Sequence, residues 1–148
     1  MKIENSPIND SLESLEKCVW PPLDSSESSY LVQTCHTLRK KHLKDFSIED
    51  FRIMIGQNIG LNFLIPLAID ILKSNILAEG DFYEGDLLKS VLTSDKEYWR
   101  VSTGNFKAMC NLFEQNESKL MSFDTTSEIK KAWFDSYTEF KTISKNEK

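Results

Sequence analysis

The sequence predicts an all-α protein, a single compact domain in which about seven or eight helices of mixed length form an irregular bundle. Apolar residues recur at spacings of three and four along most of the chain, as the buried face of a helix requires. Ser, Thr or Asp precedes several of these stretches with an acid three positions later, which is a helix-start signal. No segment alternates apolar and polar residues between turn signals, so no sheet is expected. The 148 residues suit one domain, with a polar tail at about 144–148 that frays.

A short N-terminal helix is the first predicted element. Asp10 and Glu13 have the spacing of an N-cap and its reciprocal acid. The helix would run to about Trp20, because Pro21 and Pro22 cannot continue it.

The second predicted helix covers about 25–41. Asp24 and Glu27 repeat the capping signal at its start. Its end, 39–41, is basic and suits the negative end of the helix dipole. The residues at helical spacing are Tyr30, Leu31, Thr34, Cys35 and Leu38.

A third helix is expected to begin after Ser47, which forms a capping signal with Asp50. Gly56 and Gly60 bracket its end, and Gly56 would weaken the last turn slightly. Its apolar stripe consists of Ile48, Phe51 and Ile55.

The fourth predicted helix, about 61–77, is apolar nearly all round as far as Leu72, which is typical of a helix in the centre of a domain. Pro66 falls near its first turns, where a missing N–H costs little. Asp70 is the one charge inside this run. We expect it at the rim or satisfied by a hydrogen bond rather than acting as a catalytic acid.

The segment 79–86 reads EGDFYEGD and predicts a loop with two glycines and four acids. Asp86 is expected to cap a short helix that runs through Thr93. Phe82 and Tyr83 could anchor an interface, although we favour packing of these rings back onto the 61–77 helix.

Three further helical segments follow. Ser94 and Glu97 predict the start of a short helix, with a break at about 101–104 before a longer one. Thr125 and Glu128 predict the start of the last helix. The apolar stripes of the two longer helices are Phe106, Met109, Leu112 and Phe113, and then Ile129, Trp133, Tyr137 and Phe140.

The charge balance points away from nucleic acid and towards protein. The formal net charge is −5, with the acidic excess upstream of residue 101. Direct binding to nucleic acid is disfavoured, because neutralising phosphates needs a basic surface. A basic protein partner is compatible with this charge. The sequence shows neither a signal peptide nor an apolar run long enough for a membrane span, so we expect no membrane partner and a cytoplasmic location.

No enzymatic motif is present. The sequence has no phosphate-binding glycine loop, zinc-protease motif or nucleophile elbow, so we expect neither an enzyme nor a cofactor. The three widely spaced cysteines predict reduced thiols, of which two or three are buried. A metal site at Cys35, His36 and His42 is not expected, because adjacent helical residues point to different faces. We expect both histidines to face solvent or to pack in a basic, exposed stretch.

The acids of the 79–86 loop admit three interpretations. We favour a structural turn with a helix cap. Contact with a basic partner comes second, and a metal site comes last, because the spacing does not match the calcium-binding pattern of an EF-hand.

Much of the block 38–99 resembles the immunity proteins of contact-dependent growth inhibition (CDI) systems of the Bacteroidetes type. Among the matching stretches, IGQNIGL at 55–61 and LAEGDFY at 77–83 are specific when taken together. The others are LRKK at 38–41, LKDFSIED at 43–50, LIPLA at 64–68 and GDLL at 85–88.

The resemblance implies a non-enzymatic protein that binds and neutralises the C-terminal toxin domain of a neighbouring cell. Such toxins are often nucleases, and an acidic inhibitor would occupy the basic active site by mimicking phosphate charge. The alternative is a helical adaptor module with an unrelated partner. Shared residues more naturally serve the fold, so specific contacts could instead lie in the segments 1–33 or 101–148. The candidate toxin-binding residues are Glu79, Asp81, Tyr83, Glu84 and Asp86.

Overall fold

The computed structural model describes residues 7–24 and 29–143. Within these residues the secondary structure is helical, and the predicted all-α class is confirmed. Its pairings between extended segments are two isolated β-bridges, Ser11 with His42 and Glu79 with Glu84. The α-helices are α1 (Leu12–Leu15), α2 (Tyr30–Arg39), α3 (Ile48–Gly56), α4 (Leu61–Ser74), α5 (Asp86–Leu92), α6 (Lys96–Val101), α7 (Thr103–Gln115), α8 (Glu117–Ser122) and α9 (Ser127–Phe140), with 3₁₀ turns η2 (Pro7–Asn9) and η3 (Leu43–Asp45).

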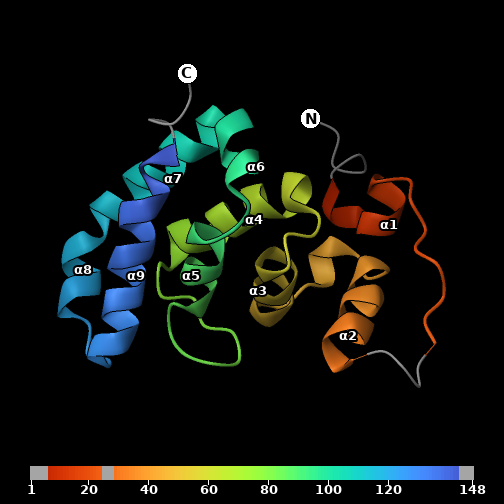
Figure 1. Cartoon of the computed structure of the whole chain (residues 1–148), viewed down its shortest axis with the longest axis horizontal. Coiled ribbons are helices and arrows are strands. Elements are labelled where there is room, and N and C mark those ends of the chain that lie inside the picture. Colours follow the sequence, from red (N-terminus) through yellow and green to blue (C-terminus); the bar gives the residue numbers. More distant parts are fainter. Residues whose placement is uncertain (1–6, 25–28, 144–148) are drawn as a thin grey trace.

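The helices follow one another along the long axis of the molecule (Figure 1). Helices α1 and α2 form one end, α7 to α9 form the other, and α3, α4 and α5 lie between them. Helix α3 packs against α4 and α5, and α5 packs against α9. The short helix α5 therefore links the middle of the chain to its C-terminal end.

One continuous apolar core connects these helices, and it extends from Leu12 to Ile143. Helix α4 has the central position predicted for it, and Asp70 is exposed at its rim. Its buried residues are Leu61, Leu64, Ile65, Ala68, Ile69 and Leu72. The C-terminal end is dominated by aromatic residues, with Phe113 stacked on Tyr137 at 4.1 Å between ring centroids. The stripes predicted for α7 and α9 are buried here, except for the half-buried Ile129.

Four of the predicted helix starts lie within one residue of the observed ones, and one is right in detail. Ser47 and Asp50 form a capping box at α3, with each side chain accepting the backbone N–H of the other residue. At three other helices the cap is the next residue along the chain, namely Ser11, Asp95 and Thr126 in place of Asp10, Ser94 and Thr125. Ser94 is engaged elsewhere, because its buried hydroxyl donates to the Val91 carbonyl and accepts from the Trp99 indole.

The first helix is much shorter than predicted. Helix α1 ends at Leu15 rather than near Trp20, and Lys17 has a left-handed backbone with a φ of 54°. The side chain of Arg39 fixes the chain that follows, because its guanidinium donates to the Glu16 carboxylate and to the Cys18 carbonyl. This tertiary contact stops the helix before the prolines are reached.

The predicted bounds of α2 and α4 also differ from the observed ones. Helix α2 begins after Ser29, whose side chain caps it, and ends at Arg39 rather than at residue 41. The predicted capping residue Glu27 and the tail 144–148 lie outside the described residues. Helix α4 ends at Ser74 rather than at 77, because Asn75 is extended and its side chain accepts the Leu77 N–H. The prediction missed α8, which buries only Leu120.

Candidate functional site

The loop 79–86 connects the region after α4 to the start of α5. Its backbone pairs Glu79 with Glu84, and the Gly85 N–H donates to the carbonyls of Leu77 and Ala78. Gly85 has a φ of +90°, a conformation that favours glycine. A Cβ atom there would lie 2.7 Å from Cε2 and Nε1 of the buried Trp133 ring. The Trp133 N–H donates to the Gly85 carbonyl at 3.2 Å, so α9 holds this end of the loop.

Asp86 organises the loop from inside. Its side chain is 3% exposed and accepts the backbone N–H groups of Gly80 at 2.7 Å, Phe82 at 3.0 Å and Tyr83 at 3.3 Å. The prediction that Asp86 caps α5 is therefore wrong. Asp86 is the first residue of α5, Gly85 occupies the cap position without a side-chain bond, and the Asp86 carboxylate caps the loop instead.

Helix α3 holds the other side of the loop. Glu49 accepts the Asp81 N–H at 2.8 Å and the Nε of Arg52 at 2.7 Å through the same oxygen. The Arg52 hydrogen bonds lower the pKa of Glu49, and the Asp81 amide adds to this effect against the opposing influence of burial. The Nε of Arg52 also lies 3.9 Å from Asp86. Glu49, Arg52 and Asp86 thus form one charged clamp, which we call the loop clamp.

The remaining three acids of the loop face solvent. Glu79, Asp81 and Glu84 are exposed, and their carboxylates form neither a hydrogen bond nor an ion pair with any residue that the structure describes. Of the five predicted contact residues, these three are available to a partner. Tyr83 is half-buried, and burial together with the charge of Asp86 raises its pKa, so it stays neutral at physiological pH.

Phe82 does not lie where we predicted it. The ring does not fold back onto α4; it is 69% exposed and lies under the Arg52 guanidinium, at 4.4 Å from Cζ to the ring centroid. A cation above an aromatic face is attractive, so this contact holds the ring in place without burying it.

The sequence alone reveals only one part of the loop clamp, the pairing of Glu49 with Arg52. Glu49 and Arg52 are three residues apart on a capped helix, which is the spacing of a surface ion pair. Nothing in the local sequence shows that the same Glu49 oxygen also reaches the amide of Asp81, 32 residues away. That contact depends on the packing of α3 against α5.

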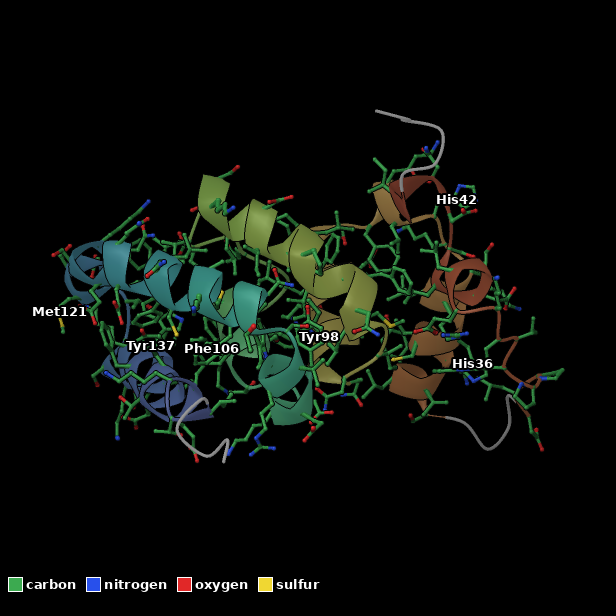
Figure 2. All side chains as sticks on the ribbon, turned by 90° about the horizontal axis from the view of Figure 1, so that it is seen from above. His36, His42, Tyr98, Phe106, Met121 and Tyr137 are labelled. Atoms are coloured by element: carbon green, nitrogen blue, oxygen red, sulfur yellow. The ribbon has the colours of Figure 1, made fainter. Side chains whose placement is uncertain are left out.

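The basic stretch at the end of α2 is less exposed than predicted. Arg39 is 2% exposed and lies 4.4 Å from the centroid of the Trp20 ring, and Lys41 donates to Asp50 at 2.7 Å. His36 meets the Trp20 ring edge-on, while His42 is exposed. Figure 2 shows the two histidines at the same end of the molecule without converging.

The cysteines and the acids show no metal-binding arrangement. Cys35 is buried, Cys110 is half-buried and Cys18 is exposed, and all three are free thiols. Across residues 7–24 and 29–143, no three His, Cys, Asp or Glu side chains converge in a way that could hold a metal ion. In the same parts of the chain, no helix combines the length and apolarity that crossing a membrane requires.

A comparison with known families gives one match. The family model of CDI immunity proteins matches residues 14–109, which is well over half of the chain. The chain belongs to the family of CDI immunity proteins. Neither a curated protein nor a solved structure matches it. The matched residues include the block recognised in the sequence, the whole loop 79–86 and all three residues of the loop clamp.

Membership indicates what kind of protein this is. An immunity protein acts against a toxin, so the family implies a cognate toxin as partner and suggests a non-enzymatic inhibitor. Helices α8 and α9 lie beyond the matched residues, although Trp133 of α9 supports Gly85 of the loop.

Proposed function

We propose that this CDI immunity protein binds the C-terminal toxin domain of its own growth-inhibition system and neutralises it by covering a basic, nuclease-like active site. The observation that carries the proposal is a hydrogen-bonded loop inside the family-matched segment, with three exposed carboxylates, Glu79, Asp81 and Glu84, that have no bonded partner among the described residues. The net charge of −5 has the sign that such a toxin surface would attract.

Rigidity gives the exposed charges a fixed geometry. The backbone amides of Gly80, Asp81, Phe82 and Tyr83 are all bonded to carboxylates of the loop clamp. A loop that is ordered before binding loses little conformational entropy when it meets its partner. The three carboxylates could therefore take the place of backbone phosphates in a nuclease cleft.

The proposal is tested with the purified C-terminal domain of the cognate toxin, which this family leads us to expect in the gene immediately upstream. Purified wild-type protein should bind that domain tightly by isothermal titration calorimetry and abolish its cleavage of nucleic acid. Affinity should fall as salt rises, because charge attraction is screened. Absence of binding, or a bound complex that still cleaves, would contradict the proposed function.

The structure also decides which acids to neutralise in this assay. Replacing Asp86 would remove the acceptor of three amides and disturb the loop itself. The informative variant is the triple Glu79→Gln, Asp81→Asn and Glu84→Gln, which leaves the loop clamp intact. We expect about tenfold weaker binding and a smaller salt dependence. The matched control neutralises three exposed acids on other helices and their connections: Asp70, Glu117 and Asp124.

A further inference from the structure

A groove lies between the N-terminal end of α2, the start of α3 and the loop 79–86. Its volume is about 530 Å³. Figure 1 shows the loop and the first turn of α2 on the same side of the molecule, with α3 between them. Its lining includes Tyr30 and Leu31 of α2, Glu49 and Arg52 of α3, and Asp81 and Phe82 of the loop.

The rims of this groove expose apolar side chains. Tyr30 is 83% exposed, Leu31 is 39% exposed, and Phe82 on the opposite rim is 69% exposed. Helix α2 buries its other face through Cys35 and Leu38, so its first turn has no role in the core. Exposed aromatic residues that converge on one groove are typical of protein contact sites, because they bury much area for few rotatable bonds.

The fold holds Phe82 out from the core. Its backbone N–H is bonded to Asp86, and one face of its ring is covered by Arg52, which is itself bonded to Glu49. The ring is therefore fixed by the loop clamp while most of its surface stays in solvent. Because the ring is already held in an exposed position, it loses little conformational entropy when a partner packs against it.

The charge of the groove indicates which kind of partner it fits. Glu49 is neutralised by Arg52, and Asp50 by Lys41, whereas Asp81 is attracted by the Arg52 charge but forms no ion pair with any described residue. Glu79 and Glu84 add two more exposed carboxylates on the same loop. The groove thus combines apolar rims with uncompensated negative charge, which fits a protein segment that carries both lysine or arginine and an apolar side chain.

Resting on the proposed function, we propose that the toxin domain docks in this groove, with an apolar side chain between Tyr30 and Phe82 and a cationic side chain against Asp81. This arrangement joins two parts of the sequence. Asp81 and Phe82 lie in the loop and Tyr30 and Leu31 lie about fifty residues earlier, and all four fall within the family-matched residues 14–109. The loop supplies the charged contact, and the first turn of α2 supplies the apolar contact on the opposite rim.

The experiment measures the affinity of full-length variants for the purified C-terminal domain of the cognate toxin. Tyr30→Ala and Phe82→Ala should each weaken binding by roughly 10- to 30-fold. The matched controls are Val101→Ala and Met121→Ala, which remove apolar side chains that are 76% and 59% exposed. Figure 2 places Met121 at the opposite end of the molecule from the histidine of α2, His36. These controls should bind as the wild type does.

Hydrogen exchange on the wild-type complex provides a second measurement that does not depend on any variant. The first turn of α2 and the loop 79–86 should gain protection when the toxin domain is added. If wild type binds but both groove variants bind equally well and neither segment gains protection, this inference is overturned while the proposed function stands. If wild type does not bind the domain, the proposed function fails first.

Discussion

The loop 79–86 has an inner side and an outer side that use similar residues differently. On the inner side, Asp86 is buried and its carboxylate accepts three backbone amides, while Gly85 packs against Trp133. On the outer side, Glu79, Asp81 and Glu84 are exposed and unpaired within the described residues. Whether an acid in this loop stabilises the fold or is available for binding therefore depends on what its carboxylate oxygens contact.

The comparison makes a general prediction about substitutions. Changes on the inner side should cost stability, whereas changes on the outer side should affect binding and leave stability nearly unchanged.

The largest effect is expected for Gly85→Ala. The new Cβ would meet the buried Trp133 ring, and the φ of +90° disfavours any residue with a side chain. Strain and overpacking together should lower the free energy of unfolding by about 3 kcal/mol or more. Thermal unfolding should show a melting temperature lowered by roughly 10 °C.

Gly104→Ala is the control for this first prediction. A Cβ atom at Gly104 would meet nothing within 4 Å, and Gly104 lies in the first turn of α7. Alanine should therefore leave stability unchanged or raise it by about 0.5 kcal/mol, because it restricts the unfolded chain. Equal melting temperatures for the two variants would contradict the role assigned to Gly85.

Asp86→Ala is expected to have the next largest effect. The amides of Gly80, Phe82 and Tyr83 would lose their acceptor, and Arg52 would lose a charge 3.9 Å away. We expect a loss of about 2 kcal/mol in chemical denaturation. Amide exchange by nuclear magnetic resonance should speed up at these three residues. Asp124→Ala, at an exposed acid, should change neither measurement.

Glu49→Gln should have a smaller effect that depends on pH. The pKa of Glu49 is lowered by the Arg52 hydrogen bonds, so unfolding raises it towards its usual value of about 4.3. At pH values between the lowered pKa and about 4.3, Glu49 therefore binds more protons in the unfolded chain than in the folded chain. The contribution of Glu49 is present above about pH 4.3 and is lost as pH falls through the lowered value.

The pH dependence gives this prediction its measurement. Urea unfolding at neutral pH should show a loss of about 1 kcal/mol for Glu49→Gln, since only part of the charged hydrogen bonding disappears. The difference from wild type should shrink steadily on acidification below about pH 4.3. A Glu117→Gln control should leave urea unfolding at neutral pH unchanged, because Glu117 is exposed. A constant difference at all pH values would show that charge on Glu49 is not responsible.

The sequence predicted most of the helices, but it missed α8 and did not predict the contacts between helices. Helical spacing identified α4 as the central helix, and the Ser47–Asp50 pair gave the start of α3. At three other helices the local pattern placed the N-cap one residue early. Two neighbouring residues could each act as the N-cap there, and tertiary contacts decide which one does. Ser94 illustrates this, since its hydroxyl is bonded to the indole of Trp99.

The candidate site was predictable to a similar degree. Glycines and acids identified the loop 79–86, but burial separates Asp86 from the exposed acids, and burial is set by helices distant in the sequence. Glu49 and Arg52 of α3 were missed because their contact with Asp81 spans 32 residues. Tyr30 was assigned to an apolar face, yet it is 83% exposed, because the apolar stripe of α2 extends beyond the core it covers.

The smallest effect on stability is expected for the outer-side triple Glu79→Gln, Asp81→Asn and Glu84→Gln. Because these carboxylates have no bonded partner in the described structure, the free energy of unfolding should stay within about 0.5 kcal/mol of wild type. Relief of the repulsion among three nearby acids opposes the loss of the attraction between Asp81 and Arg52, so little net change is expected. Chemical denaturation of the variant used in the toxin-binding assay checks this directly. A loss as large as that of Asp86→Ala would mean that the outer acids also hold the loop, and the separation between its two sides would fail.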